Sequence, residues 1–200
     1  EKFLRKYQGF FRTVYFIPSV ISLTVVGLLW QMIYNPNIGI LNSALKAIGF
    51  ERFAYDWLGN SKTAIYAIIA VSQWQYTGYI MLLFLVAIQK IPSELYEAAM
   101  IDGANRVQVF FNVTVPQVRE MIMVNVTITI IGAFKVFDEV YVMTAGGPGR
   151  SSEVLATYMY RSAFRNDEMG YAATIAFVIF VTTFTLSFLQ NRLFGSGHET

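Results

Sequence analysis

Three charged side chains lie close together near the end of one of the most apolar stretches of this chain. Lys135, Asp138 and Glu139 fall within residues 118–144, a segment long enough to cross a bilayer as a helix. An ionisable group at membrane depth is a functional candidate, because an unpaired charge in hydrocarbon is costly. On one continuous helix, Lys135 would lie three and four residues from the two carboxylates, so mutual pairing is the alternative. We expect Lys135 and Asp138 either to line a substrate path or to compensate charge within the helix.

A second apolar stretch, residues 63–88, carries a run of polar and aromatic side chains. Sugars are bound through hydrogen bonds to their hydroxyls and through an aromatic ring against their C–H face. Gln75, Tyr76 and Tyr79 supply both kinds of group. Gln75 and Tyr79 are four residues apart, so they share one side of a helix. Hydrogen bonding between the helices of a membrane bundle is the competing interpretation of these side chains.

A polar island, residues 90–117, separates these two apolar stretches. Ser93 is expected to cap a short helix, Glu97 lies near its positive end, and Gly103 fits its C-terminal stop. The small pair Ala98-Ala99 allows close approach by a partner, as in helix-in-groove recognition. The island is therefore a candidate docking element, and a loop helix lying on the bilayer is the alternative.

These side chains need elements to position them, and the composition indicates membrane helices. Of the 200 residues, 55% are hydrophobic and 14% are charged, whereas a typical soluble domain has about 25% charged residues. Four stretches approach the roughly 20 residues that a helix needs to cross a bilayer. We predict an all-α, polytopic transmembrane helical bundle forming a single domain over residues 1–200, with spans at 13–34, 63–88, 118–144 and 171–189.

Four spans place both chain ends and the polar island on one side of the membrane. In the first span, Pro18 is expected in the first turns, where proline costs least. The sequence does not begin with methionine, so we expect an N-terminal part to be missing. Four basic residues crowd the start of the first span and favour cytoplasmic termini: Lys2, Arg5, Lys6 and Arg12.

Several other chemistries find no support in the sequence. The chain has no cysteine, which excludes disulfides and thiolate sites, and its one histidine, His198, lies in a polar tail, so we expect no metal site. The net charge of +2 is too small to indicate nucleic-acid binding. The glycine-rich run 146–149 lacks the lysine and the spacing of a phosphate-binding loop, so we expect a stiff turn there.

The polar island resembles the EAA loop of ABC-importer permeases. The matching residues are Glu97-Ala98-Ala99, Asp102-Gly103-Ala104 and Val113-Thr114-Val115-Pro116. Further blocks, at 16–18, 35–42, 144–148 and 171–173, are similar to carbohydrate permeases of the maltose and glycerol-phosphate type. The resemblance covers nearly the whole chain and implies the core of a six-span permease without its first spans.

This resemblance implies roles for particular residues. The helix bearing Glu97, Ala98 and Ala99 would be a coupling helix held in a groove of an ATPase, with Asp102 and Gly103 at its end. The positions that match those lining the sugar site of maltose-type permeases are Ser72, Gln75, Tyr76, Tyr79, Thr129 and Ala133.

The resemblance also implies partners and a location. We expect a cytoplasmic ABC ATPase dimer, which would bind the ATP and Mg²⁺, a second permease subunit, and an extracytoplasmic sugar-binding protein. This chain itself would bind no cofactor. It would lie in the lipid of the inner membrane of a prokaryote, with both its termini cytoplasmic.

The expected function is that of a transport subunit rather than an enzyme. The chain would form the translocation path for a sugar, or a related polyol or oligosaccharide, by alternating access coupled to a separate ATPase. One rival is an ion-coupled secondary transporter that uses Lys135, Asp138 and Glu139 as its ion or proton site. The other is a non-transporting membrane scaffold whose cytoplasmic loop recruits a partner.

Overall fold

The computed structural model describes residues 2–194, with the backbone alone for residues 2–6 and 194. His198 and the side chains of Lys2, Arg5 and Lys6 therefore lie outside the described part. All the regular elements described in residues 2–194 are helical, which confirms the all-α class. They are α1 (Lys2–Val20), α2 (Leu23–Ile33), α3 (Ile40–Ala47), the 3₁₀ turn Glu51–Phe53, α4 (Ala64–Gln89), α5 (Ser93–Ile101), α6 (Arg106–Val109), the π-helical segment Phe110–Thr114, α7 (Val115–Gln117), α8 (Arg119–Lys135), α9 (Asp138–Thr144), α10 (Leu155–Phe164) and α11 (Met169–Phe194).

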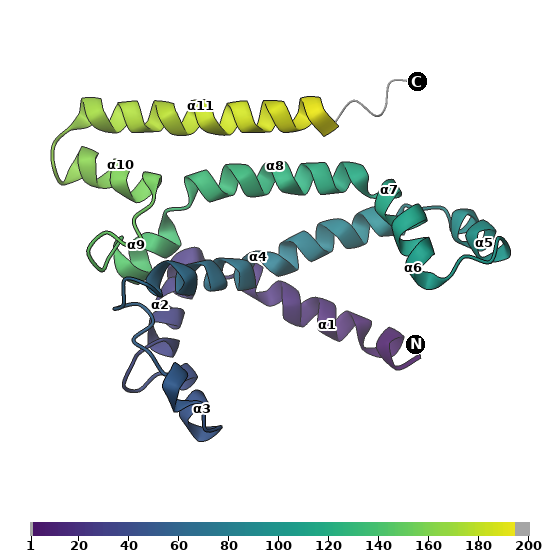
Figure 1. Cartoon of the computed structure of the whole chain (residues 1–200), viewed down its shortest axis with the longest axis horizontal. Coiled ribbons are helices and arrows are strands. Elements are labelled where there is room, and N and C mark those ends of the chain that lie inside the picture. The colour runs from purple at the N-terminus through teal and green to yellow at the C-terminus, as the bar shows by residue number, and fades with distance from the viewer. Residues whose placement is uncertain (1, 195–200) are drawn as a thin grey trace.

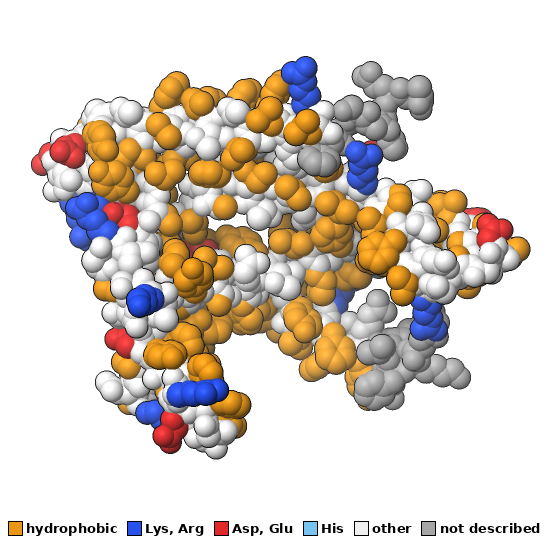
Figure 2. Space-filling model, in the orientation of Figure 1, with side chains coloured by type: hydrophobic (Ala, Val, Ile, Leu, Met, Phe, Trp, Pro, Cys, Tyr) orange, Lys and Arg blue, Asp and Glu red, His pale blue; other side chains and the backbone are white. Residues whose placement is uncertain are grey.

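Four long helices connect two ends of the molecule (Figure 1). α1 packs against α4, and α8 packs against α11. The loop elements α5–α7 lie at one end, beside the start of α1 and the end of α11, while α2, α3, α9 and α10 lie at the other (Figure 1). Hydrophobic side chains cover the middle of the face shown in Figure 2, and charged side chains gather toward the two ends. This distribution is what a bilayer-crossing bundle requires.

Two helices, α4 and α11, are each long and apolar enough to cross a membrane, and two bent helix pairs raise the number of candidate spans to four. The predicted spans 63–88 and 171–189 correspond to α4 and α11 within a few residues. The other two predicted spans are bent, and their boundaries differ from the prediction. The assignment of residues 1–200 to a single domain stays a prediction.

The first predicted span, 13–34, is bent in the structure, and only the predicted position of Pro18 in its first turns is wrong. α1 ends at Val20, and α2 begins at Leu23 at an angle of 101° to it. Pro18 therefore lies in the last turn of α1 rather than in the first turns of a span. Proline weakens the helix around it, and Ser22 then takes an extended conformation with φ −55° and ψ 136°.

The third predicted span, 118–144, is wrong at its C-terminal end. α8 stops at Lys135, and the preceding segment, 106–117, is bent by 67° against it. Phe137 leaves the helical path and stacks on Tyr141, with ring centroids 5.0 Å apart, while its ring also contacts Tyr160 of α10. These contacts with a distant helix explain why the apolar run does not continue as one rod.

The predicted pairing of Lys135 with Asp138 and Glu139 on one helix is consequently wrong. α8 ends at Lys135, and α9 starts at Asp138 after two residues outside the helices. Among the residues that the structure describes, no ion pair joins Lys135 to either carboxylate. The charges do not compensate one another in the way that helical spacing suggested.

The tightest packing surrounds α2, α4 and α9. Their buried side chains include Val26, Ile68 and Val140. α1 and α4 approach so closely at Gly78 that a Cβ there would overlap the backbone of Tyr15. Small residues permit such contacts between membrane helices, where close van der Waals packing replaces the hydrophobic effect.

Candidate functional site

The predicted docking helix, α5, ends in a Schellman motif at Gly103. Gly103 has a φ of +78°, its N–H donates to the carbonyl of Met100 at 3.1 Å, and the N–H of Ala104 donates to that of Ala99 at 2.9 Å. A Cβ on Gly103 would meet no heavy atom within 4 Å. The backbone conformation, rather than crowding, is therefore what calls for glycine. The predicted C-terminal stop is confirmed, with Asp102 as the C-cap.

The start of α5 differs from the prediction. Pro92 occupies the N-cap position, and Ser93 is the first helical residue, without a side-chain capping bond. Pro92 has an extended conformation, with φ −59° and ψ 137°, and its carbonyl accepts from the N–H of Leu95 at 3.3 Å. The prediction of Ser93 as the cap is wrong because the proline backbone itself starts the helix.

The segment after Gly103 is tied closely to the base of α8. Asn105 and Gln108 form a reciprocal capping box at the start of α6, with N···O distances of 3.0 and 2.8 Å. The hydroxyls of Tyr96 on α5 and Thr114 in the π-helical segment are 3.2 Å apart. This contact, which the sequence analysis did not identify, connects the docking helix laterally to the chain that leads into α8.

No residue of α5 is buried. Glu97 and Ala98 are exposed, and Ala99 is half-buried. The uncovered apolar side chains include Ile101, which is 86% exposed. Uncovered apolar side chains on a short helix are compatible with docking to a partner, and the role of α5 as a docking element stays a prediction.

The polar side chains of α4 form two separate arrangements, the first of which surrounds Glu139. The Ser72 hydroxyl donates to Oε1 of Glu139 on α9 at 3.3 Å, and Glu139 is only 2% exposed. Tyr76 lies within electrostatic reach of the carboxylates of Glu139 and Asp138. The structure thus places the Ser72 hydroxyl in contact with a buried carboxylate, with Tyr76 within its electrostatic influence.

Gln75 belongs to the second arrangement, at the break between α1 and α2. Its Nε2 donates to the carbonyl of Ile21 at 3.0 Å, and its side chain is 3% exposed. The bend leaves that carbonyl outside the regular helical ladder, so a buried donor is needed to satisfy it. This contact is the interhelical hydrogen bonding named above as the alternative; substrate contact by Gln75 stays a prediction.

The other predicted path residues lie on the surface of the single chain. Tyr79, Thr129 and Lys135 are exposed, and the Thr129 hydroxyl donates to the carbonyl of Asn125 within α8 at 2.8 Å. Ala133 lines an open cavity of about 550 Å³ beside α10. Within residues 2–194, no three His, Asp or Glu side chains lie close enough together to hold a metal ion. The roles of these residues in a substrate path stay predictions.

Comparison with known proteins identifies the family. Residues 2–194 match the family described as "Binding-protein-dependent transport system inner membrane component". The probable ABC transporter permease protein YurN of Bacillus subtilis (strain 168) is 53% identical over 100% of this chain and 68% of its own length. The diacetylchitobiose uptake system permease protein NgcF of Streptomyces coelicolor (strain ATCC BAA-471 / A3(2) / M145) is 36% identical over 94% of this chain and 55% of its own.

Other comparisons agree. The arabinooligosaccharides transport system permease protein AraP of Bacillus subtilis (strain 168) is 33% identical over 96% of this chain and 62% of its own length. The chain thus spans about 55–68% of these relatives. In fold, it matches a bacterial ABC transporter that imports the acidic polysaccharide alginate, with a TM-score of 0.87 and 24% identity over 97% of this chain and 68% of that one. The chain belongs to the binding-protein-dependent inner membrane components, the permeases of ABC importers, which are multi-pass transport subunits rather than enzymes.

Proposed function

We propose that this member of the permease family forms part of the membrane path of an ATP-driven importer for a sugar, or a related polyol or oligosaccharide. The observation that carries the proposal is the uncovered helix α5, whose Schellman motif at Gly103 coincides with the EAA-type block of the sequence. The names of several relatives support the substrate class, because they refer to diacetylchitobiose, arabinooligosaccharides and lactose.

Under this proposal, α5 is the coupling helix, and the groove that receives it belongs to a cytoplasmic ATPase dimer. The ATPase subunits bind ATP and Mg²⁺. Closure of the dimer moves α5, and the contact between Tyr96 and Thr114 transmits the displacement toward α8. ATP shifts the conformational balance only because its binding favours one of the two bundle arrangements over the other.

The two bends are the natural places for the bundle to change shape. The helical path turns by 101° between α1 and α2 and by 67° before α8. Rigid helices joined at such points can rotate without unfolding their interiors. Alternating access is therefore proposed to use these breaks, with Ser72, Tyr76, Tyr79, Thr129 and Ala133 as the residues nearest the cargo.

The proposed orientation follows from the partner of α5. The start of α1, the end of α11 and α5 lie at the same end of the molecule (Figure 1), so both ends of this chain are proposed to be cytoplasmic. The opposite end, with α3 and α10, would face the extracytoplasmic sugar-binding protein. A second permease subunit would complete the membrane path.

The proposal is tested with the assembled importer in sealed vesicles. Uptake of radiolabelled lactose, arabinotriose and diacetylchitobiose should require ATP and should survive dissipation of ion gradients. Uptake abolished by an uncoupler but insensitive to ATP depletion would instead favour the ion-coupled transporter. Absence of uptake and of sugar-stimulated ATP hydrolysis would favour the scaffold.

A matched pair of variants tests the docking face itself. Ile101→Asp places a charge on a side chain that is 86% exposed on α5, whereas Ile38→Asp places one on a side chain that is 81% exposed, two residues before α3. Helix α3 lies at the end of the molecule opposite α5 (Figure 1). We expect Ile101→Asp to lower ATPase retention at least tenfold in co-purification, because the charge would be desolvated in the groove. Ile38→Asp should leave retention unchanged. Equal retention in both variants would contradict docking through α5.

A further inference from the structure

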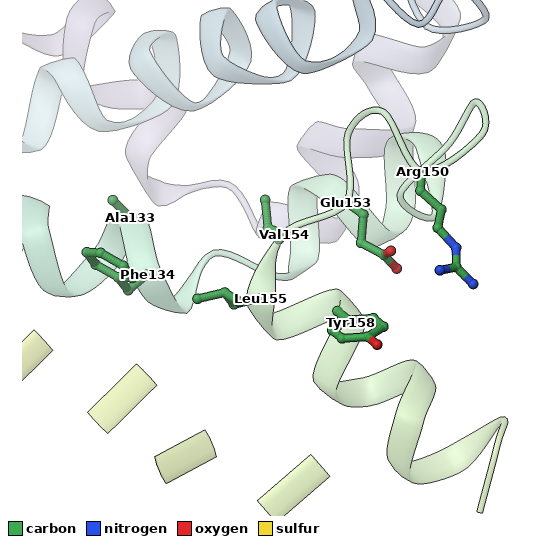
Figure 3. A pocket seen from close by; sticks show the side chains of 7 residues that line it. All are labelled: Ala133, Phe134, Arg150, Glu153, Val154, Leu155 and Tyr158. Carbon is green, nitrogen blue, oxygen red and sulfur yellow. The ribbon is translucent and has the colours of Figure 1, made fainter. Parts of the chain in front are cut away.

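A cavity lies between the end of α8 and α10, at the end of the molecule opposite α5 (Figure 1). Its volume of about 550 Å³ is in the range of small-ligand sites. Figure 3 shows two parts of its lining, an apolar part around Ala133 and Phe134 and a polar part with Arg150, Glu153 and Tyr158. The cavity therefore offers both an apolar surface and groups that form hydrogen bonds.

One polar wall is rigid, because Glu153 is clamped by Arg161 of α10. Each carboxylate oxygen lies 2.7 Å from a guanidinium nitrogen of Arg161, which gives a bidentate pair. The same guanidinium lies over the ring of Tyr158, 5.2 Å from its centroid. The charge of Glu153 is thus already compensated, and Tyr158 is held in place beside it.

The remaining charge of the cavity lining is that of Arg150. Within the described part of the chain, its guanidinium has no ion-pair or hydrogen-bond partner. Its backbone has a φ of +70°, directly after Gly149 at +56°, a conformation that costs an L-residue energy. The turn is held by hydrogen bonds from the N–H of Ser151 to the carbonyl of Pro148 and from the N–H of Glu153 to that of Arg150. A defined turn therefore presents an uncompensated cation at the cavity.

We propose that this cavity binds an acidic saccharide unit, a sugar ring that carries a carboxylate. The carboxylate would pair with the Arg150 guanidinium, whose planar fork matches two carboxylate oxygens. The Tyr158 hydroxyl, which donates to the hydroxyl of Tyr171 at 3.4 Å, and the Glu153 carboxylate would accept hydrogen bonds from the ring hydroxyls. Phe134 and Leu155 lie toward the other end of the lining (Figure 3) and would cover the C–H face of the adjoining sugar unit. The inference rests on the proposed function, since it names the substrate class for the outer part of the same path.

The absence of cysteine from the 200 residues provides a site-specific test. Leu155, which lines the cavity and is exposed, is replaced by cysteine, and its reaction with a maleimide is followed on this chain in the assembled importer without ATP. Cellobiouronic acid should protect the thiol at a concentration at least tenfold lower than cellobiose does. Added salt should weaken the protection, because it screens a partly exposed ion pair.

Two charge-removing substitutions complete the test. Arg150→Gln should raise the concentration of the acidic probe needed for protection about tenfold, corresponding to one charge-assisted contact. Arg165→Gln is the matched control, because Arg165 is an arginine at the other end of α10, as its C-cap, and does not line the cavity. Equal protection by the two probes, or equal effects of the two substitutions, would overturn the inference.

The outcome is separable from the proposed function. Protection requires no ATP, so vesicles that take up sugar with ATP while the acidic probe gives no protection would refute this inference alone. Protection without ATP-driven uptake would instead refute the importer function. If Leu155→Cys does not assemble, equilibrium dialysis of radiolabelled cellobiouronic acid against the complex that retains Leu155 gives the same comparison with Arg150→Gln.

Discussion

Replacement of Gly103 tests the proposed transmission of ATP-driven motion through α5. Gly103 has a φ of +78°, whereas proline holds φ near −65°, about 140° away. Gly103→Pro also removes the N–H that donates to Met100, and the altered backbone would displace the N–H that donates to Ala99. The end of α5 would therefore lose the Schellman motif that directs the chain back toward α6.

The expected magnitude follows from these contacts. Two backbone hydrogen bonds contribute about 1 kcal/mol each in net terms, so the native turn loses about 2 kcal/mol. That free energy corresponds to about a 30-fold smaller population of the docking-competent conformation. Gly103→Ala keeps both N–H groups but places an L-residue at positive φ, which costs about 1–2 kcal/mol. Asparagine tolerates this conformation better, so the loss of function should increase from Gly103→Asn through Gly103→Ala to Gly103→Pro.

Gly49 provides a matched control at the opposite end of the molecule. Gly49 follows α3 with a φ of +81°. The N–H of Gly49 donates to the carbonyl of Lys46, and the N–H of Phe50 donates to the carbonyl of Leu45. A Cβ on Gly49 would also meet no heavy atom within 4 Å. Gly49→Pro therefore damages the same motif in a different place. Any general effect of proline at such a turn should appear equally in both variants.

The assay measures ATPase retention on the purified permease and sugar-stimulated ATP hydrolysis in vesicles. Gly103→Pro should insert and pair with its partner permease but lose most retained ATPase and stimulation, by up to about 30-fold. Gly49→Pro should retain the ATPase. Normal stimulation in Gly103→Pro, or equal loss of retention in Gly49→Pro, would refute the assignment of Gly103 as the turn that positions the docking helix.

Two further predictions concern the stability of the bundle, measured as thermal unfolding of the detergent-solubilised complex. Gly78→Ala should lower the free energy of unfolding by about 1–3 kcal/mol, because the new Cβ overlaps the backbone of α1. Gly132→Ala is the control, because a Cβ at Gly132 would meet no heavy atom within 4 Å, and it should not destabilise the bundle. Equal unfolding temperatures for the two variants would contradict the close approach of α1 and α4. Gln75→Leu should lower the free energy of unfolding by about 1–3 kcal/mol by leaving the part-buried carbonyl of Ile21 without its donor, whereas Gln73→Leu, at an exposed position, should have little effect.

Parts of the candidate site were predictable because they depend on local chemistry. A glycine after a short helix indicates a left-handed stop, and Gly103 adopts one. The identity of the cap at the other end was not predictable from residue type, because Pro92 started the helix through its backbone rather than through a side chain. The link between Tyr96 and Thr114 was missed because their 18 residues of separation have no periodic signal.

The roles of the polar residues in the spans depended on tertiary packing. Gln75 and Tyr76 are neighbours in an apolar helix, and both have groups that could bind a sugar. Only the arrangement of α1 against α4 turned Gln75 toward the Ile21 carbonyl. Only the placement of α9 against α4 brought Tyr76 and Ser72 beside Glu139.

The sequence by itself determined that this is a helical membrane protein with a presented polar loop, because bilayer thickness and the cost of buried charge act on every local stretch. The family followed from the same loop and its neighbouring blocks. The tertiary structure decided where the apolar helices break. Phe137 leaves the path of α8 and contacts Tyr160 of α10. At the bend after Val20, the side chain of Gln75 donates a hydrogen bond to the carbonyl of Ile21. Such contacts join residues far apart in the chain, so no local pattern encodes them.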